Sequence, residues 1–295
     1  MTSDKPARRL APPPIRNLAK PKLKLPLGAC DTHFHFFGPQ TEFPFNPIRN
    51  FVPDVDHEDS TIEDWLKLQA TLGFSRGLLV QSMLYYPSYE IVLHALCRLP
   101  DRLRAVIMPR KAITDKELAI LTNAGVVGLR FSRPTGTTID THLMDRAHEH
   151  GWGMHYLFHD EEHARAWRKD VLASPGKFVI EHMGNPPIAK GVDSDAFKFV
   201  LECLDTGRCW VKLSDRVSTQ DTFPFSDLRP FVDKLLERAP NRLLWGTDWP
   251  HPQYWRPMPS DTDLLDLMLE WVPDEAVRKR IFVDNPIEAF GFPPV

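Results

Sequence analysis

The stretch Asp31-Thr32-His33-Phe34-His35 ends a short apolar run that begins at Leu25 and is typical of a buried strand. Because side chains alternate between the two faces of a strand, His33 and His35 point the same way, about 7 Å apart along the chain. Two imidazoles on one face can bind a metal ion or polarise a carbonyl oxygen. An isolated pair of this kind is more often structural, so its function depends on what the rest of the chain brings to it.

A second apolar segment far along the chain, 242–248, also has the character of a strand, and it ends on the carboxylate of Asp248. Between the two segments, short apolar runs alternate with longer helical stretches. The strand candidates are 27–35, 77–82, 103–108, 126–132, 152–158, 177–182, 209–214 and 242–248. The helix candidates are 60–73, 88–99, 114–124, 138–150, 161–173, 195–205 and 226–238, with one or two more in 261–290.

This alternation predicts an α/β fold in which a parallel sheet is buried on both faces. Eight such units close into a (β/α)₈ barrel of the TIM type. A doubly wound open sheet is the alternative, but the first strand is not followed by the glycine-rich phosphate turn that this fold uses. Residues 27–295 therefore read as one barrel domain, and the basic, proline-rich residues 1–26 as a flexible or surface-wrapped arm.

The composition excludes several classes of protein. No apolar run approaches the ~20 residues that span a bilayer, so we expect no membrane partner. The formal net charge of -3 gives no sign of a nucleic-acid partner. Four scattered cysteines suggest reduced thiols in a cytoplasmic protein. Monomer and homo-oligomer both stay open.

Ionisable side chains gather where the predicted strands end, which is the side on which barrel active sites lie. Bare charge in a core is costly, so packing alone does not explain this gathering. The side chains at these ends are His33, His35, Arg130, His155, His159, His182, Arg216 and Asp248. Ser82 and Tyr85, after the second strand, are candidate substrate contacts. Glu181 is expected to face outward or to support a neighbouring ligand.

Three motifs resemble those of the amidohydrolase superfamily, in its amidohydrolase-related branch, and within it the lactonases that act on 2-pyrone-4,6-dicarboxylate. These motifs are Asp-Thr-His-Phe-His at 31–35, Glu-His-Met-Gly-Asn-Pro at 181–186 and Trp-Gly-Thr-Asp-Trp-Pro-His-Pro at 245–252. The resemblance runs from about Leu27 to Phe290.

The resemblance implies a hydrolase that opens a lactone ring in the catabolism of aromatic compounds. Asp248 would activate water, and His33, His35 and His182 would surround the carbonyl oxygen. Arg130 and Arg216 would hold substrate carboxylates, a task that suits the planar guanidinium.

The strand-five tyrosine of these lactonases matches Tyr156 only with a shift of one residue, and strand alternation would turn His155, Leu157 and His159 inward instead. Tyr156 is nevertheless taken as a candidate substrate contact. A small anionic lactone with one carboxylate, or with a sulfonate, fits the retained arginines as well as the dicarboxylate does.

The resemblance leaves the cofactor open between none and one divalent metal ion, with zinc the leading candidate. The ligands would be His33, His35, His182 and Asp248, with His155 or His159. No strand-four lysine is present to bridge two metals, which disfavours a binuclear centre. A metal-dependent decarboxylase or hydratase of the same superfamily is the alternative function, and a non-catalytic barrel that binds a small molecule is the second.

Overall fold

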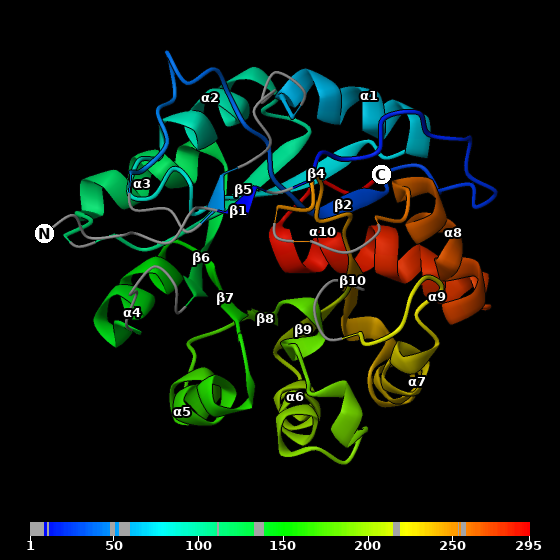
Figure 1. Cartoon of the computed structure of the whole chain (residues 1–295). Helices are drawn as coiled ribbons and strands as arrows, with labels where there is room; N and C mark the ends of the chain where they lie inside the picture. The colour runs from blue at the N-terminus through cyan, green and yellow to red at the C-terminus, as the bar shows by residue number, and fades with distance from the viewer. Residues whose placement is uncertain are drawn as a thin grey trace, which may run out of the picture.

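The computed structural model describes residues 9–10, 12–47, 51–52, 60–110, 112–132, 139–214, 219–252, 254 and 258–295. Eight parallel strands form a barrel, and the helices surround it (Figure 1). The strands are β2 (Cys30–Phe34), β4 (Arg76–Val80), β5 (Leu103–Ile107), β6 (Val126–Ser132), β7 (Gly153–Leu157), β8 (Phe178–Ile180), β9 (Cys209–Leu213) and β10 (Leu243–Trp245). The predicted (β/α)₈ fold is confirmed. A separate pair joins β1 (Arg9–Leu10) to β3 (Phe51–Val52).

The barrel closes between its first and last strands, β2 and the segment that follows β10. Phe34 pairs with Trp249 in a parallel bridge. The amide of Asp248 donates to the carbonyl of His33 at 2.8 Å, and the amide of His35 donates to the carbonyl of Trp249 at 2.7 Å. The closure therefore places the two motifs that carry the chemistry directly beside each other.

Helices follow the strands as the sequence predicts. They are α1 (Ile62–Leu72), α2 (Glu90–Arg98), α3 (Asp115–Ala124), α4 (Thr141–Glu149), α5 (Glu161–Leu172), α6 (Asp195–Asp205), α7 (Arg229–Arg238), α8 (Asp261–Trp271), α9 (Glu275–Lys279) and α10 (Asn285–Phe290). A π-helical stretch, Arg280–Asp284, joins α9 to α10. The capping box that opens α3 forms between Thr114 and Glu117. Gly125 ends α3 with φ 107°, a conformation that suits glycine.

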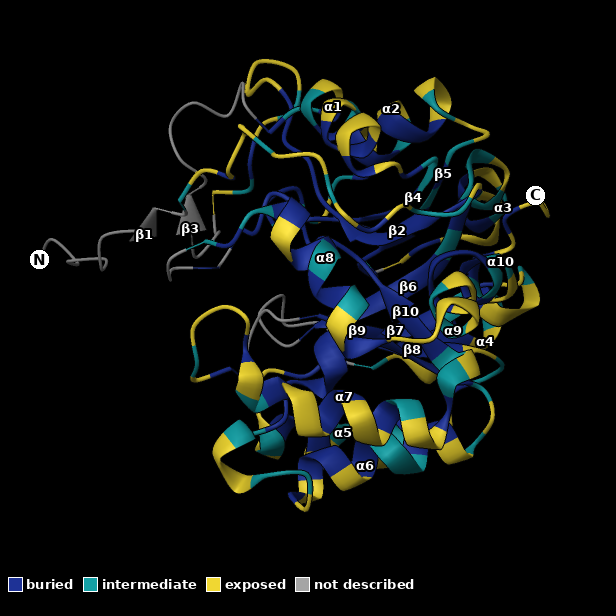
Figure 2. Cartoon of the chain, turned by 90° about the vertical axis from the view of Figure 1, so that its right-hand side faces the viewer, coloured by how far each residue is buried: buried dark blue, intermediate teal, exposed yellow. Residues whose placement is uncertain are grey.

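The strands of the barrel are largely buried, and the helices expose residues on their outer sides (Figure 2). Two apolar clusters hold these layers together, one between the strands and the helices and a smaller one inside the barrel. The inner cluster contains Cys30, Leu78, Val80, Val106, Val179, Trp210, Leu244, Phe290 and Phe292. Phe290 and Phe292 come from the end of the chain, and both are 3% exposed. Their rings pack into the inner cluster and make that end of the barrel apolar. The polar end is therefore the one at the strand C-termini.

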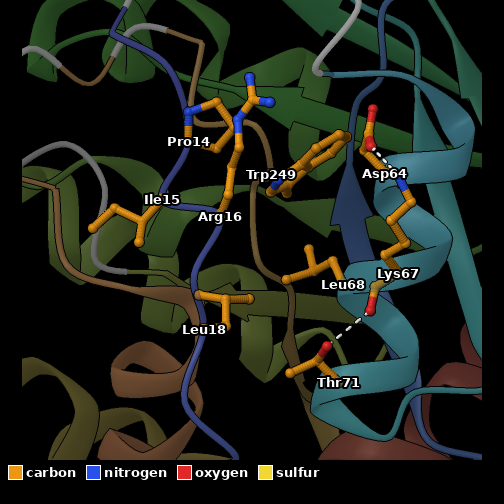
Figure 3. Close-up of a pocket in the computed structure, with 9 residues that line it drawn as sticks. All are labelled: Pro14, Ile15, Arg16, Leu18, Asp64, Lys67, Leu68, Thr71 and Trp249. Atoms are coloured by element: carbon orange, nitrogen blue, oxygen red, sulfur yellow. Dashed lines mark hydrogen bonds and ion pairs between the residues drawn. The ribbon is translucent and has the colours of Figure 1, made fainter.

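Part of the N-terminal segment lies along the barrel surface. The amide of Leu23 donates to Asp266 Oδ1 on α8 at 2.8 Å, and Thr262 Oγ1 donates to the carbonyl of Ala19 at 2.7 Å. Residues 14–18 face α1 across a cavity of about 220 Å³, and Trp249 lines this cavity as well (Figure 3). The division of the chain into an arm of residues 1–26 and a barrel of residues 27–295 stays a prediction.

Among the described residues, no helix combines the length and apolar character that crossing a bilayer requires. The four cysteines are all free thiols.

Candidate active site

His33, His35 and Asp248 meet at the point where the barrel closes. His33 Nε2 lies 3.3 Å from His35 Nε2 and 3.3 Å from Asp248 Oδ1, and His35 Nε2 lies 3.6 Å from the same oxygen. None of the three residues is more than 3% exposed. The structure thus brings together one carboxylate and two imidazoles that are more than 200 residues apart in the chain.

Asp31 anchors this junction from beneath. Its carboxylate accepts from the Thr247 amide at 3.0 Å, from Thr247 Oγ1 at 2.8 Å and from Trp65 Nε1 at 3.3 Å. Burial raises the pKa of Asp31 to about 6, although its hydrogen-bond donors act in the opposite direction. The sequence motif therefore contains a structural acid as well as the two histidines.

Backbone strain marks the same region. Asp248 has φ 59° and His182 has φ 51°, in the left-handed region that non-glycine residues rarely adopt. Each such residue costs on the order of 1–3 kcal/mol and persists only where its surroundings enforce it. For Asp248 the enforcing contact is the hydrogen bond from its amide to the carbonyl of His33.

The proton arrangement of His35 follows from its partner. His35 Nδ1 lies 2.6 Å from the carbonyl oxygen of Val80, which can only accept a hydrogen bond, so Nδ1 carries the hydrogen. His35 Nε2 therefore presents a lone pair to His33 and Asp248. Burial lowers the pKa of His35, although Asp248 opposes this shift, so the ring is neutral at pH 7.

A buried charge cluster lies beneath the histidines. Glu181 accepts from Arg130 Nε at 2.7 Å and from Lys212 Nζ at 3.3 Å. Burial would raise the pKa of Glu181, but Arg130, Lys212 and His33 together lower it well below its usual range. The expectation that Glu181 faces outward is wrong: it is fully buried, and it holds two cations in place.

Lys212 is the residue that the sequence analysis missed. It lies on β9, is 1% exposed, and its Nζ is 3.3 Å from His33 Nδ1. The signal was available, because Lys212 stands two residues after Trp210, which belongs to the inner cluster, and two before Ser214. Alternation along the strand turns all three side chains inward.

His182 completes the predicted catalytic set. Its ring centroid lies 4.7 Å from that of His33, and its Nδ1 lies 2.6 Å from Ser214 Oγ. The structure therefore brings together all four side chains that the resemblance assigns to catalysis: His33, His35, His182 and Asp248. Their individual roles stay predictions.

The predicted substrate contacts do not all lie in the cluster formed by the four predicted catalytic side chains. Ser82 and Tyr85 follow β4, and both are buried. Ser82 Oγ accepts from the Leu84 amide at 3.3 Å, and the Tyr85 hydroxyl accepts from the Gly38 amide at 2.9 Å. Arg130 faces the charge cluster through its Nε. Arg216 lies outside the described residues.

The structure does not place Tyr156 where a substrate contact was predicted. Its hydroxyl lies 2.6 Å from Ser174 Oγ, just after α5, and its ring packs against Trp167 and Phe178. The side chain is fully buried between β7 and the helices, because alternation turns the neighbouring His155 into the barrel. Tyr156 therefore supports the outer core and does not belong to the candidate site.

Two groups of described residues could hold a metal ion, His33 with His35 and Asp248, and His33 with Glu181 and His182. Tetrahedral zinc ligands at 2.0–2.2 Å lie roughly 3.3–3.6 Å from one another, and the first group matches this spacing. The second group already surrounds a cation, because Lys212 Nζ lies 3.3 Å from both His33 Nδ1 and Glu181 Oε1. By spacing alone, the first group is therefore the one that could hold a single divalent ion.

Neither strand-five histidine joins the first group. His155 Nδ1 faces Glu181 Oε1 at 3.5 Å, and its ring stacks near Phe290, deeper in the barrel. His159 is exposed, and its Nε2 lies 3.1 Å from Ser132 Oγ. Neither histidine belongs to the groups of described residues that could hold a metal ion, so the place of His155 or His159 in the ligand set stays a prediction.

Known proteins resemble this chain along most of its length. It is 37% identical to a 4-sulfomuconolactone hydrolase of Rhizobium radiobacter over 279 residues, which cover 90% of this chain and 91% of the relative. It is 33% identical to a 2-pyrone-4,6-dicarboxylate hydrolase of Comamonas testosteroni, with 93% of each chain covered.

A crystal structure of an Agrobacterium tumefaciens protein superposes with a TM-score of 0.82 at 28% identity, covering 93% of this chain and all of that one. Residues 30–292 match the amidohydrolase family. The chain is therefore a hydrolase and belongs to the amidohydrolase family.

Proposed function

We propose that this protein hydrolyses the ester bond of a small anionic lactone, and that Asp248 activates the attacking water. The observation that carries the proposal is the buried Asp248 carboxylate, whose Oδ1 lies within 3.6 Å of two imidazole nitrogens at the strand C-termini. The relatives that act on a sulfomuconolactone and on a pyrone dicarboxylate support the same substrate class.

The proposed chemistry begins with a water beside Asp248. The carboxylate takes a proton as the water oxygen attacks the lactone carbonyl. Negative charge then develops on the carbonyl oxygen, and the cluster of His33, His35 and His182 would stabilise it. The intermediate collapses as the carbonyl re-forms and the ring C–O bond breaks, and the proton held by Asp248 passes to the leaving ring oxygen. A divalent ion bound by His33, His35 and Asp248 would supply Lewis-acid polarisation of the same oxygen.

We infer that arginine side chains select the substrate's anionic group. Arg130 is held by Glu181 through Nε, which fixes the plane of its guanidinium. Arg216 is the second proposed contact. Guanidinium groups bind carboxylates and sulfonates through paired hydrogen bonds. A lactone with one carboxylate or one sulfonate is therefore the proposed substrate class, as found in the breakdown of aromatic compounds.

Ultraviolet loss of the conjugated ring, measured with sulfomuconolactone, muconolactone and pyrone carboxylates, tests the reaction. Asp248→Asn should lower kcat by at least about a thousandfold, because the amide cannot accept the proton. Asp233→Asn, at an exposed surface ion pair with Arg229, is the matched control and should keep full activity. An Asp248→Asn variant as active as the wild type would contradict the proposed base.

A pH-stat separates the alternative functions. Lactone hydrolysis creates a new carboxylate and therefore releases acid, which the pH-stat records. A decarboxylase of this superfamily would release carbon dioxide, and a hydratase would add water without releasing acid. A non-catalytic barrel would bind the lactone without converting it.

A further inference from the structure

Lys212 makes two contacts that the proposed chemistry does not use. Its Nζ lies 3.3 Å from Glu181 Oε1 on one side and 3.3 Å from His33 Nδ1 on the other. All three residues are at most 1% exposed. A lysine buried to this extent requires a partner for its charge, and Glu181 supplies one.

The direction of the hydrogen bond to His33 follows from the charges. Glu181 accepts from Arg130 Nε at 2.7 Å and from Lys212 Nζ at 3.3 Å, the geometry of a carboxylate between two cations. A Lys212 ammonium is the partner that this buried carboxylate requires. An ammonium has three donors and no acceptor. His33 Nδ1 must therefore accept from Lys212, which places the ring hydrogen of neutral His33 on Nε2.

This assignment agrees with the opposite side of the ring. His33 Nε2 faces His35 Nε2 at 3.3 Å and Asp248 Oδ1 at 3.3 Å. His35 Nε2 carries a lone pair and no hydrogen, because the ring is neutral and its hydrogen on Nδ1 is donated to the Val80 carbonyl. Both neighbours are therefore acceptors, and a hydrogen on His33 Nε2 satisfies them.

A metal ion at the same place would need the other tautomer. Nε2 of His33 would have to present a lone pair, and Nδ1 would have to donate its hydrogen. Metal-bound histidines generally donate this second hydrogen to a carboxylate, a carbonyl oxygen or water. Here the nearest partner of Nδ1 is the ammonium of Lys212, and Glu181 Oε1 is farther away, at 4.0 Å.

We propose that Lys212 is a positioning residue that keeps the ring hydrogen of His33 on Nε2, and thereby makes His33 a hydrogen-bond donor to the substrate carbonyl oxygen instead of a zinc ligand. The hydrogen bond from His33 to the substrate rests on the proposed lactone hydrolysis, whereas the tautomer of His33 and the effect of Lys212 on zinc affinity do not. Removing Lys212 would let His33 Nδ1 donate to Glu181, which is the arrangement that supports metal binding.

Two measurements test this proposal without using activity. Nitrogen NMR of ¹⁵N-histidine protein, with His33 assigned by comparison with His33→Gln, should show the hydrogen on Nε2 in the wild type and on Nδ1 in Lys212→Met. Zinc titration by calorimetry should show affinity for Lys212→Met roughly ten- to a hundredfold higher than for the wild type, the range typical of residues that orient a metal ligand.

The matched controls are Lys177→Met, which removes an exposed lysine from just before β8, and Lys212→Arg, which keeps a cationic N–H donor and adds no acceptor. Lys177→Met should behave as the wild type in both measurements. Lys212→Arg should retain the Nε2 hydrogen. If Lys212→Met does not fold, the spectrum of the wild type still decides the proposal. The wild-type spectrum requires no variant.

With a lactone substrate, Lys212→Met should lower kcat roughly ten- to a hundredfold and change KM little, because the donor acts mainly in the transition state. A wild-type His33 with its hydrogen on Nδ1 would overturn the proposal. So would a folded Lys212→Met whose zinc affinity equals that of the wild type. If the wild type shows the Nε2 hydrogen but converts no lactone, the proposed function fails and the assignment of Lys212 stands.

Discussion

His155 shows how strongly the barrel interior acts on a single side chain. Burial lowers its pKa from 6.5 to about 4, although Glu181 opposes the shift, and Lys212 and Arg130 add to it. The ring is therefore neutral at pH 7. It separates the charge cluster from Phe290 and the apolar residues of the inner cluster.

The shift of His155 predicts a dependence of stability on pH. Below pH 6.5 the unfolded chain binds a proton at this residue, whereas the folded protein does not do so until about pH 4. The stabilising contribution is thus complete above pH 6.5 and is lost as pH falls toward 4, by about 3 kcal/mol in total. Urea unfolding of the wild type at pH 7 and pH 5 should show this loss, and His155→Gln should show a smaller one.

The control for this experiment is His142→Gln, since His142 is exposed on α4. Its difference in unfolding free energy between pH 7 and pH 5 should match that of the wild type. An equally large difference in His155→Gln would mean that the loss of stability comes from other groups.

Individual residues also show what the sequence could and could not predict. His33, His35, His182 and Asp248 were predictable because each lies in a motif at a strand end. Lys212 was missed, and Glu181 was expected to face outward or to support a neighbouring ligand, because charged residues are usually assigned to the surface. Only their alternation with Trp210 and Val179 places them inside. Tyr156 was misplaced because the matched motif is shifted by one residue, and such a shift turns a side chain to the opposite face.

At the scale of elements, the junction of β2 with the end of β10 determines the site. The register of β2 shifts between Asp31 and Phe34, an irregularity of the kind often found beside active sites. Phe34 stacks on Trp65 of α1 with ring centroids 3.8 Å apart, so His33 and His35 face inward. Eight apolar runs were enough to predict the barrel. Strand ends were predicted up to three residues too long, because Asp248 leaves β-geometry with φ 59°.

Thr247 ties this junction together, since its hydroxyl donates to Asp31 Oδ2 at 2.8 Å and accepts from the Trp249 amide at 3.0 Å. Thr247→Val keeps the shape of the side chain but removes one of the donors to the buried Asp31 carboxylate and the acceptor of the Trp249 amide. It should destabilise the fold by about 1–3 kcal/mol in urea unfolding, and it should also lower kcat, because Asp248 is the next residue.

Thr71→Val removes a hydroxyl that bonds to Lys67 on the exposed face of α1, and it serves as the matched control. Its unfolding free energy should stay within about 0.5 kcal/mol of the wild type. If Thr247→Val were equally mild, the hydrogen bonds to Asp31 would not contribute to closing the barrel.

At the scale of the whole molecule, α8 connects the N-terminal segment to the barrel. Asp266 on α8 accepts the Leu23 amide at 2.8 Å and the Lys22 amide at 3.1 Å. Farther toward the N-terminus, residues 14–18 lie across a cavity that Trp249 also lines (Figure 3). The segment thus approaches the residue that follows Asp248.

Asp266→Ala should release these two amides. Hydrogen exchange of Lys22 and Leu23, followed by NMR, should accelerate at least about tenfold, because local opening then costs less free energy. Exchange in β2 and β10 should not change. Asp205→Ala, which removes a surface ion pair with Arg238, should leave both sets of amides unaffected. Unchanged exchange at Lys22 and Leu23 in Asp266→Ala would show that other contacts hold this segment.

The aromatic pair Phe290 and Phe292 has a consequence for how substrate and product reach the barrel interior. Together with Trp210 and the aliphatic side chains around it, the pair fills one end of the barrel interior with buried apolar side chains. Under the proposed function, the lactone, the water it consumes and the acid product therefore reach and leave Asp248 at the opposite end, where the strands have their C-termini.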